Sequence, residues 1–147
     1  MKLTLLGLNK QQETAACELA KLLGVQLCSD GLPVQFKKSG SGLSVQYDGA
    51  ACTIRYCEDH QCWRAFGLLV EKLRHGKHFE KRENPLYENL GVMIDCSRNA
   101  VLRMEAFEVL VKRLALMGYS TVQLYTEDTY EIKEYPYFGY LRGSYAC

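Results

Sequence analysis

Polar side chains gather where two apolar runs in the last third of the chain stop. The candidates for ligand binding are Asp95, Arg98, Tyr125, Glu127 and Asp128. The guanidinium of Arg98 offers five N–H donors in a rigid fork that stays charged, so it can hold two neighbouring oxygen atoms of a ligand at once. Asp95 is placed to orient Arg98 or to cap the turn that follows it. Alternatively, Arg98 pairs with Asp95 only to hold this edge of the fold together.

Glu127 and Asp128 are adjacent acids, a combination that suggests acid–base chemistry. Successive residues of a strand point to opposite faces, so the two carboxylates can meet one substrate only if the chain has already turned. We therefore expect them at the rim of a site, where they either contact a ligand or have a structural role.

A strand, a helix and a second strand must position these side chains. Residues 90–94 carry no charge, as in a strand buried on both faces. Residues 103–117 have apolar side chains at helical spacing, followed by Gly118 as a stop, and residues 121–125 form the second strand. Such a unit predicts an α/β fold with parallel strands, so both polar clusters lie at one carboxyl-terminal edge, where barrels and open α/β sheets bind ligands.

These residues also carry a family resemblance. The motifs are GVMIDCSRNAV, a helix ending in LALMGY, and LYTEDTYE followed by PYFGYLRG. Over residues 85–145 they resemble the opening of the catalytic barrel of family 20 glycoside hydrolases, above all the bacterial branch with a YTEDTYE-like second strand. Residues 1–84 resemble, more weakly, the small α+β domain that precedes this barrel, best at IRYC and WRAFGLLVEKL.

The resemblance implies an exo-β-N-acetylhexosaminidase that removes terminal N-acetylglucosamine or N-acetylgalactosamine. Arg98 matches the arginine that hydrogen-bonds the hydroxyls at carbons 3 and 4 of the terminal sugar. In the retaining mechanism of this family, the substrate's own acetamido oxygen attacks carbon 1, an Asp steadies that group, and an adjacent Glu protonates the leaving oxygen. The resemblance implies neither a metal nor an organic cofactor.

The family's Asp-Glu pair lies at the end of the fourth barrel strand, and nothing before Cys147 matches it. A complete (β/α)₈ barrel needs roughly 250 residues, whereas about 60 follow Pro85. We therefore expect the amino-terminal portion of an enzyme, with no catalytic residue in this chain and no activity alone. The alternative is a non-catalytic, stand-alone remnant that binds carbohydrate weakly or self-associates through open barrel edges.

Ahead of this unit, residues 1–84 predict an α+β domain with two helices. The helices span residues 11–23, with Ala15, Leu19, Leu22 and Leu23 on the apolar face, and residues 60–74. The predicted strands are 2–8, 25–28, 34–38, 43–48 and 51–56. Asp48-Gly49 between two of them is a hairpin signal. Residues 79–88, with five charged side chains and Pro85, are predicted as the junction to the second domain, 85–147.

Two other clusters have two interpretations each. The aromatic-rich segment 135–143 could line a sugar subsite or pack against further parts of the barrel. Cys57, His60 and Cys62 could offer three zinc ligands, but C-x₂-H-x-C is not a common zinc spacing and no second ligand pair lies nearby. We expect them to be residues at a strand end and a helix start, and we expect no metal.

Composition restricts the partners. The 18 basic and 17 acidic residues give a net charge of +1, which provides no electrostatic reason to bind nucleic acid or an anionic membrane. No segment reaches the roughly 20 apolar residues that span a bilayer, and the amino terminus lacks a signal-peptide pattern. The seven cysteines are odd in number, and several, such as Cys17, sit in apolar patterns. Buried, reduced thiols and a cytoplasmic location are the expectation.

Overall fold

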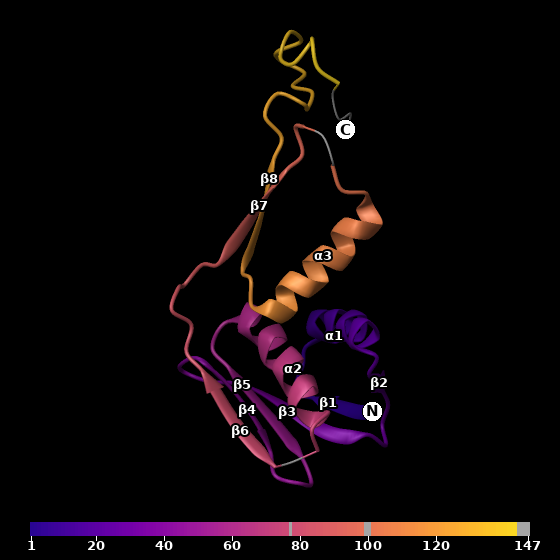
Figure 1. The fold of residues 1–147 in the computed structure, drawn as a ribbon, viewed down its shortest axis with the longest axis vertical. Coiled ribbons are helices and arrows are strands. Elements are labelled where there is room, and N and C mark those ends of the chain that lie inside the picture. The colour runs from indigo at the N-terminus through magenta and orange to yellow at the C-terminus, as the bar shows by residue number, and fades with distance from the viewer. Residues whose placement is uncertain (77, 99–100, 144–147) are drawn as a thin grey trace.

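The computed structural model describes residues 1–76, 78–98 and 101–143. A six-stranded sheet with two helices is followed by a β-α-β unit (Figure 1). The elements of the first part are β1 (Lys2–Leu6), α1 (Lys10–Leu23), β2 (Gln26–Leu27), β3 (Leu32–Lys38), β4 (Leu43–Tyr47), β5 (Cys52–Tyr56), α2 (Asp59–Leu73) and β6 (Phe79–Glu83). Those of the second are β7 (Gly91–Asp95), α3 (Met104–Met117) and β8 (Thr121–Tyr125). The predicted mixed α/β fold is confirmed.

The strands of the first sheet lie in the order β2-β1-β3-β5-β4-β6. Neighbours from β2 to β5 run parallel, while β4 runs antiparallel to both β5 and β6. The hairpin predicted from Asp48-Gly49 is confirmed, since β4 and β5 pair from Leu43↔Tyr56 to Tyr47↔Cys52. The carboxylate of Asp48 caps this turn by accepting hydrogen bonds from the backbone amides of Ala50 and Ala51, at 2.9 and 2.8 Å.

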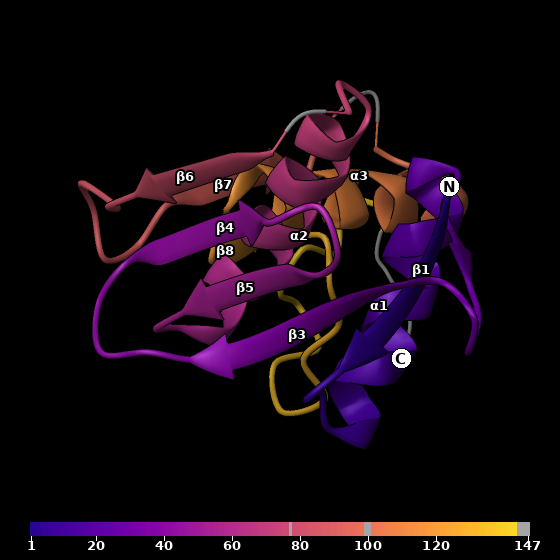
Figure 2. The same cartoon turned by 90° about the horizontal axis from the view of Figure 1, so that it is seen from below.

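The core lies between one face of this sheet and the two helices. Its fully buried side chains include Val34, Val45 and Ile54 from the strands and Phe66 and Leu69 from α2. They occupy alternate positions along each strand, as a sheet with one covered face requires. Viewed from below, the opposite face of the sheet is uncovered and the helices lie behind it (Figure 2).

Helix α1 begins with a reciprocal cap, in which the side chains of Asn9 and Gln12 each accept a hydrogen bond from the other's backbone amide. It buries Ala16, Leu19 and Ala20, so its apolar face is turned slightly from the predicted one. Cys17 is exposed, and the expectation that it is buried is wrong. Two of the three buried side chains are alanines, and the leucine spacing alone could not show this.

Residues 79–83 form an edge strand instead of the predicted interdomain junction. β6 pairs with β4 through its backbone, from Leu43↔Glu83 to Tyr47↔Phe79. Its sequence, FEKRE, lacks the apolar alternation of a half-buried strand. Charged side chains are tolerated at a sheet edge, where they discourage pairing with another chain. The connection between the two parts is therefore the segment 84–90.

The β-α-β unit has the predicted order and direction. β7 and β8 pair in parallel from Gly91↔Thr121 to Asp95↔Tyr125, and α3 ends at Gly118, which has a φ of 92°. The expectation that β7 is buried on both faces is wrong for the described residues, since Met93 is 62% exposed. Only β8 pairs with β7 there, and the face that carries Met93 has no covering layer.

Helix α3 attaches this unit to the first part, and Figure 1 shows it beside α1 and α2. Leu116 packs against the first core, and Gly67 on α2 allows this approach, because a Cβ there would lie 3.3 Å from the Leu116 side chain. Lys112 bonds Glu18 of α1 at 2.9 Å. Hydrogen bonds from Lys21 and then Lys112 lower the pKa of Glu18 to about 2. Among the described residues, no helix is long and apolar enough to cross a bilayer.

Candidate functional site

The carboxyl ends of β7 and β8 lie side by side, as the parallel arrangement predicts. Asp95 is the register partner of Tyr125, and the amide of Cys96 extends the ladder by donating to the Tyr125 carbonyl at 2.7 Å. The chain leaves both strands at this edge, which brings the two polar clusters of the sequence together.

Asp95 both caps the turn after β7 and orients Arg98. Its Oδ1 accepts hydrogen bonds from the backbone amide and the hydroxyl of Ser97, at 2.8 and 2.7 Å. Its Oδ2 accepts from Nη1 of Arg98 at 2.9 Å. The Arg98 side chain is nevertheless 66% exposed. Asp95 therefore holds the guanidinium through Nη1, and about two thirds of the Arg98 side chain is exposed at the edge of the site.

This network lowers the pKa of Asp95 below its usual value of 3.8, chiefly through the Ser97 hydroxyl, with a smaller contribution from Arg98. Because folding lowers this pKa, the turn is stabilised above pH 3.8 and loses that support as pH falls through the lower, folded value. We expect Ser97→Ala to raise the Asp95 pKa more than Arg98→Gln does. Carboxyl-carbon NMR titration of both variants checks this order, and an unchanged midpoint in Ser97→Ala would contradict it.

Glu127 and Asp128 lie in a turn rather than in the strand. The amide and hydroxyl of Thr129 both donate to the Thr126 carbonyl, and Glu127 has a φ of 50°, in the left-handed region. The chain has thus turned before the two acids, which meets the condition under which both can face one partner. That partner within the protein is Arg142, whose Nη2 lies 3.2 Å from Glu127 Oε2 and whose Nε lies 3.2 Å from Asp128 Oδ1.

Sequence reasoning missed Arg142. Its Nη2 also donates to the Ser97 carbonyl at 2.7 Å, so one side chain ties the turn after β7 to the turn after β8. The backbone brings it there, because Gly139 packs so closely on the Asp128 carbonyl that a Cβ would collide with it. The one signal in the sequence was a lone cation inside the aromatic segment 135–143. Since Arg142 already forms ion pairs with both Glu127 and Asp128, this geometry favours an organising role for the two acids.

The aromatic segment packs partly on itself and leaves ring faces open. Phe138 contacts Tyr130 with ring centroids 5.4 Å apart, and Tyr137 meets Tyr140 edge to face at 6.4 Å. Tyr137 is still 82% exposed and Tyr135 67% exposed. Open aromatic faces suit either packing against further protein or stacking on sugar rings, and both interpretations stand.

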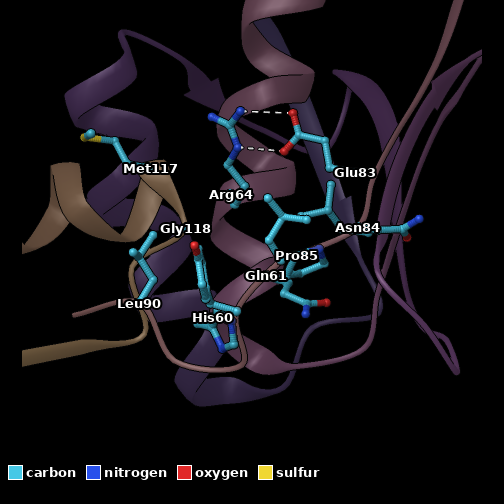
Figure 3. A pocket seen from close by; sticks show the side chains of 12 residues that line it. His60, Gln61, Arg64, Glu83, Asn84, Pro85, Leu90, Met117 and Gly118 are labelled. Atoms are coloured by element: carbon cyan, nitrogen blue, oxygen red, sulfur yellow. Dashed lines mark hydrogen bonds and ion pairs between the residues drawn. The ribbon is translucent and has the colours of Figure 1, made fainter.

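Apart from this edge, a hollow of about 170 Å³ lies between α2, the 84–90 connection and the end of α3. Figure 3 shows His60, Leu90 and Met117 around it. Its charged groups are already paired, since Arg64 donates from Nε and Nη2 to both oxygens of Glu83, each at 3.0 Å. Because Arg64 and Glu83 pair with each other and residues of both parts line this hollow, we interpret it as a joint between the two parts.

The residues of the C-x₂-H-x-C motif do not form one cluster. His60 lines the hollow, whereas Cys62 is fully buried in the first core. Within the described residues, no group of three His, Cys, Asp or Glu side chains could hold a metal ion. Burial raises the pKa of Cys62 to about 12 and that of Cys52 to about 11, so these thiols are inert apolar side chains, as expected. Cys147 lies outside the described residues.

No protein-family profile and no curated protein matches the chain. Solved structures do. The N-acetyl-β-hexosaminidase of Streptomyces plicatus in complex with Thio-NAglucal matches with a TM-score of 0.69 and 16% identity, over 98% of this chain and 36% of its own. The GH20 exo-β-N-acetylglucosaminidase of Vibrio harveyi in complex with N-acetylglucosamine matches with a TM-score of 0.65 and 17% identity, over 93% of this chain and 24% of its own.

A GH138 enzyme targeting pectin rhamnogalacturonan II also matches, with a TM-score of 0.62 and 9% identity, over 93% of this chain and 26% of its own. The fold is thus shared by glycoside hydrolases that differ in substrate, and likeness alone does not identify the sugar. The chain spans between 24% and 36% of these three structures. The resemblance predicted from the motifs is confirmed at the level of fold: the chain has the mixed α/β fold of the part of GH20 β-hexosaminidases that it matches.

Proposed function

We propose that this chain is the amino-terminal portion of an exo-β-N-acetylhexosaminidase-like glycoside hydrolase, acting on terminal N-acetylglucosamine or N-acetylgalactosamine. The observation that carries the proposal is the arrangement of Arg98. Asp95 fixes it at the carboxyl edge of two parallel strands, and most of its side chain remains exposed. In a fold shared with GH20 enzymes, this is where a sugar-binding group belongs.

In this proposal, Arg98 donates hydrogen bonds to the hydroxyls at carbons 3 and 4 of the terminal sugar. Tyr125 on β8 is the register partner of Asp95, and Arg142 holds Glu127 and Asp128 at the rim, so the pocket wall is rigid before substrate binds. The acetamido oxygen of the substrate attacks carbon 1, and an Asp-Glu pair from a barrel segment outside this chain steadies the acetamido group and protonates the leaving oxygen. No metal or organic cofactor takes part.

A second candidate is a non-catalytic protein that self-associates through its barrel edges. The exposed faces of β7 and β8 favour it, since Met93 is 62% exposed and Leu124 is 50% exposed. Unpaired strand edges next to apolar side chains promote pairing between chains. Sedimentation of the purified chain separates the candidates, because this one requires a defined oligomer of the 147-residue chain.

The proposed function predicts that the purified chain binds the sugar without hydrolysing it. Methyl β-N-acetylglucosaminide should shift the NMR signals of the Arg98 guanidinium, and an aryl N-acetylglucosaminide should not be turned over. Arg103→Ala, at the exposed start of α3, is the matched control and should leave the titration unchanged. Turnover by the chain would place catalytic residues within it, and sugar binding unaltered in Arg98→Ala would remove the role of Arg98.

A further inference from the structure

The uncovered face of the first sheet is polar throughout its centre. Strand register places one set of side chains there, opposite in direction to the buried residues of the same strands. This set is Gln35, Lys37, Ser44, Gln46, Thr53, Arg55, Glu80 and Arg82. Figure 2 looks onto this face, where β3, β5, β4 and β6 lie in front of the helices. Large apolar side chains, which form the centre of most protein interfaces, are missing from the set.

The charges on this face are mostly positive and form a row across the strands. Lys37 on β3 is the register partner of Arg55 on β5, and Ser44 on β4 separates Arg55 from Arg82 on β6. Arg82 is paired with Glu80 at 2.7 Å. Within the described ranges, neither Lys37 nor Arg55 has an ion-pair partner. Like charges on directly opposed residues destabilise a sheet, so the repulsion between Lys37 and Arg55 raises the free energy of the folded protein. The stability of the fold therefore gives no reason for this pair.

The row borders a groove of about 560 Å³ that continues onto the turn between β3 and β4. Arg55 and Arg82 line the groove together with Ser39, Ser41 and Ser44. The Oγ of Ser39 is buried and has no hydrogen-bond partner. A buried hydroxyl without a partner is uncommon, and Ser39 lines the same groove as Arg55.

We propose that this face binds an acidic glycan strand, with a sulfate or carboxylate on Arg55 and Lys37 and sugar hydroxyls on the serine and glutamine side chains. Adjacent strands lie about 4.8 Å apart, so Arg55 and Arg82 are roughly 10 Å apart across β4 and present separate contacts to an extended chain. Charge-assisted bonds between guanidinium and oxyanion supply the affinity. The face has no aromatic platform for bases and no apolar centre for a protein, which favours a glycan as the occupant.

The site lies within the first part of the chain and its junction at Asn84, so the experiment uses the chain itself. Calorimetric titration with a chondroitin sulfate hexasaccharide should show binding that weakens with added salt. Arg55→Gln and Lys37→Gln should each weaken binding about tenfold without lowering the urea midpoint, because each removes a like-charge opposition. Lys81→Gln is the matched control, since Lys81 lies on β6 but pairs with Val45 of the covered face, and it should change binding less than twofold.

Other probes determine whether the site recognises the sulfate or the carboxylate of the glycan. A desulfated hexasaccharide that binds equally identifies the carboxylate as the anion recognised, and one that fails to bind identifies the sulfate; either supports the site. Three results would overturn it: equal affinity for uncharged chitohexaose, equal affinity for a hexaglutamate peptide, or equal losses in Lys81→Gln and Arg55→Gln. Catalysis plays no part in these measurements, so their outcome is independent of the proposed hydrolase function.

Discussion

If the proposed function holds, Arg98→Ala is expected to lower kcat/KM about 10²–10⁴-fold in a hexosaminidase that contains this chain together with the Asp-Glu pair. The estimate comes from two charged hydrogen bonds to sugar hydroxyls, each contributing about 1.5–3 kcal/mol to binding of the transition state. Among the described residues, Asp95 is the ion-pair partner of this exposed guanidinium, so its loss should not unfold the chain. Steady-state kinetics on an aryl N-acetylglucosaminide measures the effect.

Substrates lacking one hydroxyl make this test specific. If Arg98 binds the hydroxyl at carbon 4, the unchanged enzyme should already have a low kcat/KM on the 4-deoxy substrate. Arg98→Ala should then lower kcat/KM much less on the 4-deoxy substrate than on the normal one. Arg98→Lys should restore little, because a lysine ammonium cannot present the fork of donors. Arg103→Ala controls for removing an arginine from the same connection. Equal losses on the normal and 4-deoxy substrates would show that Arg98 acts on something other than that hydroxyl.

Local signals in the sequence predicted the β-α-β unit closely. The uncharged run before Asp95, the helical spacing up to Met117 and the glycine at 118 each correspond to an observed boundary. The hairpin at Asp48-Gly49 was predictable for the same reason, because a short turn limits the pairing of its own flanking strands. Features determined by neighbours in sequence were therefore accessible.

Features determined by distant residues were not. β6 is a strand because β4 offers it a free edge, and nothing in FEKRE itself indicates that partner. Arg142 lies 45 positions from Ser97, to which it donates, and only the close approach of Gly139 to Asp128 brings it there. The roles of Glu127 and Asp128 depended on a turn whose left-handed residue is a glutamate, a type that gives little warning of that conformation.

Phe66→Ala is expected to cost about 3–5 kcal/mol of folding free energy, which is a large part of the roughly 5–15 kcal/mol typical of a small protein. Phe66 is fully buried on α2 and packs on Phe36 of β3 with ring centroids 6.2 Å apart. Urea unfolding followed by the fluorescence of Trp63, the single tryptophan and also on α2, measures the loss. Phe138→Ala, at a ring 39% exposed, should cost about 1 kcal/mol or less.

Phe66→Ala also tests whether the stability of the β-α-β unit depends on the core of the first part. Among the described residues of the β-α-β unit, Leu114 is the only buried apolar side chain, and two strands alone are marginally stable in water. Its main support is Leu116 packed against the first core beside Gly67 of α2. Destabilising that core should therefore release the unit, so amides of β8 should lose hydrogen-exchange protection no later than Trp63 reports unfolding. Protection of β8 that outlasts the Trp63 transition would show a second part that folds on its own, and the 84–90 connection would then be a linker between independent domains.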